Sequence, residues 1–167
     1  RGANVILVSG PTSLSPPAKV EFVPVRSALE MRDAVRQHLE KASVLLMAAA
    51  VSDYRPKQAA AQKLKKTSIP PILELERNPD ILLEAGKDKG NRIFVGFAAE
   101  TQNLLKNAKE KLAKKNLDFI VANDVSLPGA GFRVDTNIVK IIGRSGKAEK
   151  LPLMSKEDLA NRILERI

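Results

Sequence analysis

Residues 48–66 read AAAVSDYRPKQAAAQKLKK and join an apolar run to a lysine-rich loop. The run from Val44 to Ala50 predicts a buried strand, which ends abruptly at a polar segment that contains Asp53. The loop that follows carries Lys63 and two further lysines. Ligands of open α/β sheets bind beyond the carboxyl ends of the strands, so this junction predicts a site for an anion.

The rest of the chain alternates between segments with the pattern of a strand and segments with the pattern of a helix. Continuous apolar runs such as 44–47 and 119–121 are typical of parallel strands covered on both faces. Strands are predicted at about 4–9, 19–25, 43–50, 72–76, 93–98, 118–122, 137–142 and 147–151. Helices are predicted at about 28–41, 79–86, 102–116 and 156–167, two of them with capping boxes at Ser27/Glu30 and Ser155/Asp158. This order predicts a doubly wound α/β fold with a mostly parallel sheet, and residues 128–151 predict a loop and an antiparallel hairpin extension.

Composition excludes several chemistries. The 167 residues are 44% hydrophobic, which suits one domain with a real core. There is no cysteine, and His38 is the single histidine, so disulfides, thiolate nucleophiles, Ser-His-Asp triads and His or Cys metal sites are not expected. The net charge of +9 favours an anionic partner. No apolar run approaches the ~20 residues of a membrane span.

Three segments of the sequence contain groups that could bind an anion or stack on a nucleobase. Asn78 and Pro79 are typical of a helix start, where free N–H groups either hold an anion or are simply capped. Lys111 and Lys115 lie four residues apart at the edge of the apolar face of one predicted helix, so they either extend to water or bind phosphate in a cleft. Phe97 either stacks on a base or packs in the core.

Seven motifs occur in a fixed order along the chain. They are AAAVSDYRP at 48–56, KLKK at 63–66, NPDIL at 78–82, VGFAAET at 95–101, KLAKKNLDFIVANDV at 111–125, GF at 131–132 and DTN at 135–137. Each motif alone is weak, but the ordered set, which covers essentially the whole chain, resembles the bacterial phosphopantothenoylcysteine synthetases. That enzyme is usually the C-terminal half of a bifunctional coenzyme A biosynthesis protein whose N-terminal half is a flavin-dependent decarboxylase.

The resemblance implies a CTP-dependent ligase. CTP would activate the carboxylate of 4′-phosphopantothenate as an acyl-cytidylate with release of pyrophosphate, and the amine of L-cysteine would then form the amide and release CMP. The resemblance also implies Mg²⁺, a Rossmann-like homodimer and a cytoplasmic location, with FMN confined to the decarboxylase half. It implies neither a nucleic-acid partner nor a membrane partner, and the sequence does not identify the metal ligands.

The resemblance also implies the site residues. Lys63 matches the catalytic lysine, which in the family lies on a flap over the active site. The CTP contacts would be Ala48, Ala49, Asp53, Lys63, Pro79, Asp80, Ile81, Leu82, Phe97, Lys111 and Lys115. The upstream glycine- and serine-rich loop of the family does not occur in this sequence. We therefore expect residues 1–167 to be a single synthetase domain that lacks its N-terminal βα unit, and we expect this fragment to be inactive by itself.

Three other functions compete with the ligase. A module of the same fold would bind a nucleotide without chemistry, and pyrophosphate release distinguishes the two. Binding of nucleic acid through net charge predicts a steep dependence of affinity on salt. A nicotinamide-dependent oxidoreductase is disfavoured, because the chain contains no G-x-G-x-x-G fingerprint.

Overall fold

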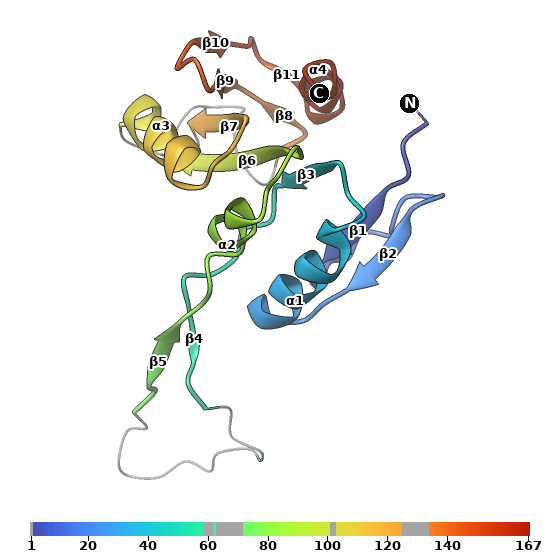
Figure 1. Cartoon of the computed structure of the whole chain (residues 1–167), viewed down its shortest axis with the longest axis vertical. Coiled ribbons are helices and arrows are strands. Elements are labelled where there is room, and N and C mark those ends of the chain that lie inside the picture. Colours follow the sequence, from blue (N-terminus) through green and yellow to red (C-terminus); the bar gives the residue numbers. More distant parts are fainter. Residues whose placement is uncertain (1, 59–61, 63–71, 101–102, 125–133) are drawn as a thin grey trace. The chain divides into compact units, whose positions relative to one another are not determined.

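The computed structural model of the chain describes residues 2–58, 62, 72–100, 103–124 and 134–167 (Figure 1). Their contacts divide the chain into two compact units. The first unit consists of Arg1–Gln37 and Ala49–Ile81, and the second consists of His38–Ala48 and Leu82–Ile167. That residues 1–167 form one domain stays a prediction.

The first unit begins with two parallel strands and a helix. Strand β1 (Ile6–Ser9) pairs with β2 (Glu21–Pro24), with Ile6 opposite Glu21. Helix α1 (Ala28–Leu39) follows directly. The N–H of Glu30 donates to the hydroxyl of Ser27 at 3.2 Å, and a Glu30 carboxylate oxygen accepts from the N–H of Arg26 at 2.9 Å. The predicted capping box is therefore confirmed, and it fixes the point where the chain leaves β2 and enters α1.

A two-stranded antiparallel ribbon completes the first unit. Strand β4 (Tyr54–Pro56) pairs with β5 (Leu75–Arg77), with Arg55 opposite Glu76. The strand predicted at about 72–76 is thus confirmed only at its end. The sequence did not predict β4, because three residues that include a proline give no strand signal.

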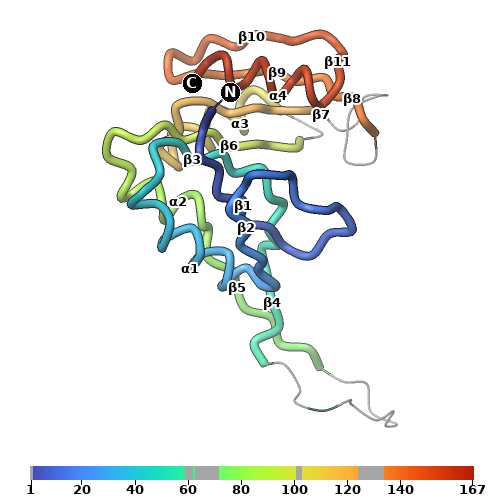
Figure 2. Tube along the Cα trace, turned by 90° about the vertical axis from the view of Figure 1, so that its right-hand side faces the viewer, coloured from blue at the N-terminus to red at the C-terminus, as the bar shows by residue number. Residues whose placement is uncertain are grey.

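The second unit is built on a five-stranded sheet. Its order is β10-β9-β7-β6-β3. Strands β3 (Val44–Met47), β6 (Ile93–Glu100) and β7 (Phe119–Asp124) are parallel, whereas β9 (Val139–Gly143) runs antiparallel to β7 and pairs with β10 (Ala148–Lys150) (Figure 2). The α/β prediction of a mostly parallel sheet with a hairpin extension is confirmed.

Helices cover both faces of this sheet. On one face α2 (Ile81–Lys87) and α3 (Leu104–Lys114) pack on a buried cluster that includes Phe94, Ile120 and Ile142. On the other face α4 (Lys156–Leu164) packs on a second buried cluster that includes Val95 and Val121. Side chains of a strand alternate between the faces, so consecutive residues of β6 and β7 serve different clusters.

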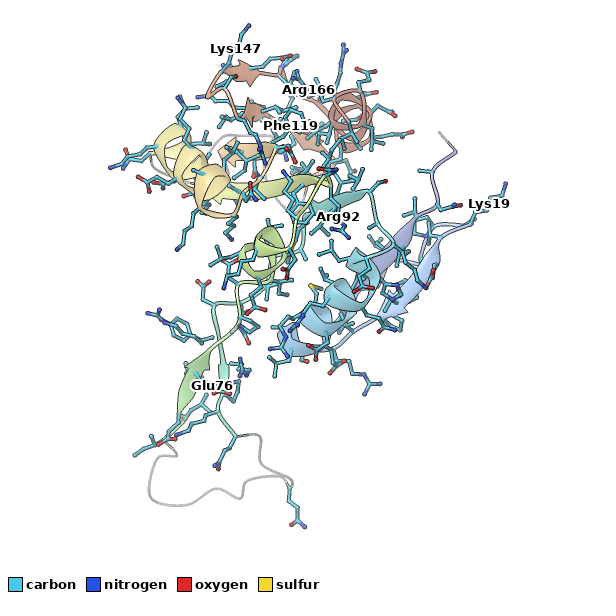
Figure 3. All side chains as sticks on the ribbon, viewed as in Figure 1. Lys19, Glu76, Arg92, Phe119, Lys147 and Arg166 are labelled. Atoms are coloured by element: carbon cyan, nitrogen blue, oxygen red, sulfur yellow. The ribbon has the colours of Figure 1, made fainter. Side chains whose placement is uncertain are left out.

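The remaining elements close the second unit. Strands β8 (Thr136–Asn137) and β11 (Met154–Ser155) form a short antiparallel pair. The N–H of Asp158 donates to the hydroxyl of Ser155 at 3.0 Å, which confirms the second predicted cap. Arg92, which precedes β6 and is labelled in Figure 3, donates from Nε to the carbonyl of Leu39 at 2.8 Å within the second unit. No helix of the described residues is long and apolar enough to cross a membrane.

Candidate functional site

The segment after β3 is exposed, as a ligand-binding strand end requires. Ala48 belongs to the second unit and Ala49 to the first, and the side chains of both are exposed, as is that of Asp53. The small alanine side chains leave the backbone accessible to a ligand. The CTP contacts of Ala48 and Ala49 stay a prediction.

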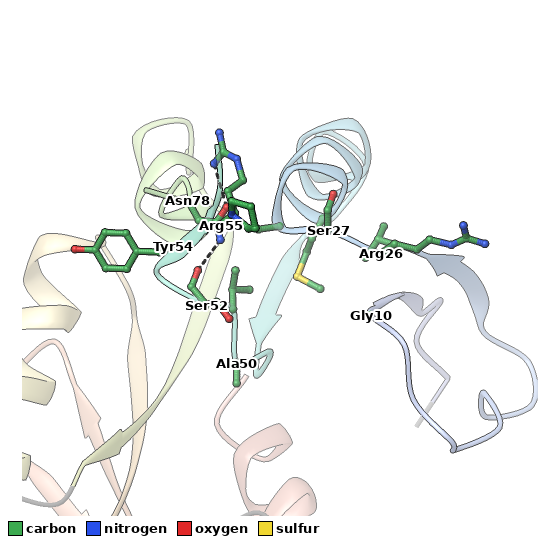
Figure 4. Close-up of a pocket in the computed structure, with 13 residues that line it drawn as sticks. Gly10, Arg26, Ser27, Ala50, Ser52, Tyr54, Arg55 and Asn78 are labelled. Atoms are coloured by element: carbon green, nitrogen blue, oxygen red, sulfur yellow. Dashed lines mark hydrogen bonds between the residues drawn. The ribbon is translucent and has the colours of Figure 1, made fainter. Parts of the chain in front are cut away.

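Asn78 fastens this segment to the chain that leads into α2. Its backbone N–H donates to the carbonyl of Asp53 at 2.8 Å, and its side-chain Nδ2 donates to the carbonyl of Ser52 at 2.8 Å (Figure 4). The Oδ1 atom of Asn78 accepts from Nη1 of Arg55 at 3.0 Å. Helix α2 begins at Ile81, so the prediction of Asn78 as its N-cap is wrong, because the Asn78 side chain is used to hold the Ser52 segment.

Arg55 is a second clamp that sequence reasoning missed. Besides Asn78, its guanidinium donates to the carbonyl of Arg77 at 2.9 Å and lies 2.8 Å from a carboxylate oxygen of Glu76. A planar guanidinium can satisfy several acceptors at fixed angles, which a lysine cannot do. These contacts join residues more than twenty positions apart, so no local pattern in the sequence predicts them.

A pocket of about 310 Å³ lies in the first unit beside these clamps (Figure 4). It is bordered by Gly10 after β1, by Arg26 after β2 and by Ser52. Gly10 and Arg26 follow the carboxyl ends of the parallel strands β1 and β2, and ligands of open α/β sheets bind beyond such strand ends. Its lining combines apolar side chains with the two arginines Arg26 and Arg55 and with several hydroxyl groups, so it suits a ligand that has both an apolar part and an anionic part.

The predicted contacts at 79–82 differ strongly in exposure. Pro79 is half-buried and Asp80 is exposed. Ile81 and Leu82 are only 3% and 6% exposed, because their side chains belong to the core. If a nucleotide binds at this turn, Ile81 and Leu82 can offer it only their backbone.

Phe97 is not the core residue of β6. Phe94 has no exposed surface, whereas 38% of Phe97 is exposed. The alternative of a core phenylalanine at position 97 is therefore wrong, and an exposed ring is available for stacking. Positions 97 and 100 of a strand point to opposite faces, so the structure does not bring Phe97 to the face where Glu100 lies.

Lys111 forms an ion pair at the carboxyl end of β6. Its Nζ lies 2.6 Å from Oε1 of Glu100, and Nδ2 of Asn107 donates to the other carboxylate oxygen at 3.0 Å. The hydrogen bond from Lys111 is the main reason that the pKa of Glu100 lies below its ordinary value, although burial of Glu100 acts in the opposite direction. Lys111 therefore neither extends freely to water nor stands alone as a phosphate ligand.

Lys115 lies one turn further along α3. It is the C-cap residue, it is half-buried, and its N–H donates to the carbonyl of Lys111 at 3.0 Å. Just beyond it, the side-chain amide of Asn116 donates to the carbonyl of Gly86 at 3.1 Å. The end of α3 is thus fixed against α2, which sets the position of the Lys115 backbone.

The predicted catalytic residue, Lys63, lies outside the residues that the structure describes. Lys63, like Lys65 and Lys66, is not among the described residues. Within the described part of the chain no three His, Cys, Asp or Glu side chains gather closely enough to hold a metal ion. The metal ligands therefore stay unassigned.

Comparison with known proteins gives a family and close relatives. Residues 1–167 match the family described as DNA/pantothenate metabolism flavoprotein C-terminal domain. The chain is 50% identical to the coenzyme A biosynthesis bifunctional protein CoaBC of Bacillus subtilis (strain 168), over 99% of this chain and 41% of that protein. It spans about two fifths of the length of the curated relatives it matches.

Solved structures share the fold. The crystal structure of the C-terminal domain of CoaBC is 42% identical, has a TM-score of 0.82, and is matched over 99% of this chain and 73% of that one. A mutant of Cab2 in complex with phosphopantothenate-cysteine is 18% identical, with a TM-score of 0.68 over 89% of this chain and 53% of that one. At such low identity the second likeness concerns the fold alone.

Proposed function

Because the chain belongs to the family of DNA/pantothenate metabolism flavoprotein C-terminal domains, we propose that it joins 4′-phosphopantothenate to L-cysteine in coenzyme A biosynthesis. The observation that carries this proposal is the 50% identity with CoaBC over 99% of the chain. The likeness to the solved C-terminal domain of CoaBC supports the assignment to that half. The Cab2 complex supports the kind of substrate, since a protein of this fold binds phosphopantothenate-cysteine.

The proposed reaction has two steps, activation of the carboxylate and formation of the amide. The carboxylate of 4′-phosphopantothenate attacks the α-phosphorus of CTP, and the bond to pyrophosphate breaks. The amine of L-cysteine then attacks the acyl carbon, loses a proton, and displaces CMP. No protein nucleophile is needed, which agrees with a chain that has no cysteine and one histidine.

The role proposed for the protein is to hold substrates and stabilise charge. Negative charge spreads over phosphoryl oxygens in the first step, and fixed donors aimed at such charge are usually the largest catalytic contribution. In the proposed site Lys63 supplies a cation for the reacting phosphoryl group. Asp53, the 79–82 turn, Phe97, Lys111 and Lys115 contact the nucleotide. The exposure of Asp53, Asp80 and Phe97 supports these roles.

In this proposal Mg²⁺ binds with few ligands from the protein. Mg²⁺ usually keeps several waters and binds through one or two carboxylates and the phosphates of the substrate. We therefore expect the cation to be held mainly by the triphosphate of the substrate. When bound there, it would neutralise phosphoryl charge. Asp53 and Asp80, whose side chains are exposed, are the two carboxylates among the proposed nucleotide contacts.

Replacement of the proposed catalytic lysine tests the function. The full-length protein that carries this chain should release pyrophosphate and form phosphopantothenoylcysteine, detected by mass, when given CTP, Mg²⁺, 4′-phosphopantothenate and L-cysteine. Lys63→Gln should lower kcat by at least about tenfold, because removal of one such donor costs roughly 10²–10³ in rate. Lys65→Gln is the matched control, with the same charge change in the same loop, and should affect kcat less.

Two outcomes would contradict the proposal. Nucleotide binding without pyrophosphate release would support a non-catalytic binding module instead. Equal activity of wild type and Lys63→Gln would remove the role given to Lys63. Thermal shifts with CTP, ATP and GTP, each with Mg²⁺, test the proposed preference for CTP, and light scattering tests the proposed homodimer.

A further inference from the structure

Glu100 is held more firmly than an ordinary surface carboxylate. Its side chain is only 15% exposed, and each of its two oxygens accepts a hydrogen bond from α3. The donors, Asn107 and Lys111, are four residues apart and therefore lie on one face of the helix. A carboxylate held from both sides in this way has a fixed position at the end of β6.

The contact fixes Lys111 in turn. A lysine side chain is flexible, and ordering it on ligand binding weakens affinity by the conformational entropy that is lost. The 2.6 Å contact with Glu100 orders the Lys111 ammonium before any ligand arrives. An ammonium has three donors, so the pair leaves Lys111 with donors for a ligand, and 43% of its side chain is exposed.

The pairing also changes what Lys111 offers. The Glu100 carboxylate cancels most of the charge of the ammonium at a distance, so the pair attracts a phosphate only weakly from solution. What remains is a directed donor in a fixed place. This arrangement favours positioning of a bound nucleotide over long-range capture of one.

We propose that Glu100 is a positioning residue that orients the Lys111 ammonium toward the nucleotide, an inference that rests on the proposed function. Glu100 itself touches no substrate and acts through Lys111, with Asn107 holding its second oxygen. The proposal gives a role at the site to two residues, Glu100 and Asn107, that have none among the predicted CTP contacts.

A double-mutant cycle in the full-length protein tests the inference. Glu100→Gln should raise the KM for CTP about tenfold, which corresponds to about 1.4 kcal/mol, and should leave the KM for L-cysteine unchanged. Lys111→Gln should raise the KM for CTP similarly, and the double variant should be no worse than Lys111→Gln alone, because contacting residues of one unit are not additive. A residue that only stabilises the fold would instead show additive effects on KM.

Glu110→Gln is the matched control. It removes the same charge from the neighbouring exposed position of α3 and should leave the KM for CTP unchanged. If Glu100→Gln folds too poorly for assay, Asn107→Ala tests the same carboxylate through its other oxygen and should raise the KM for CTP by a smaller factor.

The failures of the two proposals are distinguishable. Absence of ligation by the wild-type protein refutes the proposed function and, with it, the inference. An active wild type in which Glu100→Gln leaves the KM for CTP unchanged, or in which the Glu100 and Lys111 effects add, overturns the inference alone.

Discussion

The Nζ atom of Lys89 lies 2.5 Å from Oδ2 of Asp118, in a buried ion pair at the amino end of β7. Lys89 is only 4% exposed, and its Nζ also lies 5.7 Å from the centroid of the Phe94 ring. The same carboxylate accepts the N–H of Phe94 at 2.7 Å and lies 3.1 Å from Nε of Arg144. Asp118 therefore joins the α2–β6 connection, β6 and β9–β10 at the end of the sheet opposite the strand ends where ligands are expected.

The first prediction is that the two residues of this ion pair differ in how much their replacement destabilises the protein. Asp118→Ala should lower the free energy of unfolding by about 3–5 kcal/mol, because it leaves the Lys89 ammonium buried without a counter-ion. Lys89→Met should cost less, since Asp118 would keep Arg144 and the Phe94 N–H and is itself 24% exposed. Urea unfolding of the variants measures both values. Equal losses would contradict this account of the pair.

The second prediction is the pH dependence of the same contact. Burial acts to raise the pKa of Asp118, but the Lys89 and Phe94 hydrogen bonds and the charges of Lys89 and Arg144 outweigh it, so the pKa lies below its ordinary value. A lowered pKa means that the folded protein binds fewer protons, so this stabilisation is complete above about pH 4 and is lost as the pH falls through the folded-state pKa.

The difference in unfolding free energy between wild type and Asp118→Asn should therefore shrink between pH 6 and pH 3. Arg32→Gln, which removes an exposed pair with Asp33, is a control in which a much smaller difference is expected at either pH. A gap between wild type and Asp118→Asn that widens in acid would show that Asp118 is not stabilised as a carboxylate.

Local patterns of the sequence predicted most of the elements but not their distant partners. The continuous apolar runs at 44–47 and 119–121 lie in β3 and β7, and the Ser27 and Ser155 caps form as expected, because each depends on residues within one turn or one strand. Asn78 was misassigned because its real acceptor, the carbonyl of Ser52, lies 26 positions away.

The candidate site shows the same division. The helical pattern correctly placed Lys111 at the edge of the apolar face, but only the structure shows that Glu100, eleven residues away, pairs with it. Lys89 belongs to a polar turn that looks solvated in the sequence, and its burial depends on tertiary packing against Phe94 and Asp118. The residue types and their periodicity predict which face of a helix or strand a side chain lies on. The partner that it meets there depends on the tertiary fold, which brings distant segments together.

The third prediction concerns the close contact between α2 and the end of α3. Gly86 lies within α2, where alanine would ordinarily be about 1 kcal/mol more favourable. A Cβ at this position would clash with the carbonyl oxygen of Lys115, which is backbone and cannot move aside cheaply. Gly86→Ala should therefore lower the free energy of unfolding by about 1–3 kcal/mol.

Gly96→Ala is the comparison for Gly86→Ala. Its Cβ would meet Leu117 Cδ1 at 2.7 Å and Leu82 Cδ2 at 3.1 Å, which are ends of flexible side chains, so its cost should be smaller. Thermal unfolding measures both variants. A Gly86→Ala protein as stable as wild type would mean that α2 and α3 can separate at this contact without loss.

The last prediction concerns the clamp that shapes the proposed nucleotide site. Asn78→Ala removes the donor to the Ser52 carbonyl and the acceptor of Arg55, so the segment that carries Asp53 loses two of its ties to the chain before α2. We expect a loss of about 0.5–1.5 kcal/mol in unfolding free energy for each of the two hydrogen bonds removed, and a higher KM for CTP. Asn78→Asp should be no better, since it keeps the acceptor for Arg55 but places a carboxylate oxygen against the Ser52 carbonyl. Asn91→Ala, at an exposed position, is the control for the amide itself, and steady-state kinetics with denaturant unfolding measures all three. An Asn78→Ala enzyme with a normal KM for CTP would show that the Ser52–Asp53 segment keeps its place without this side chain.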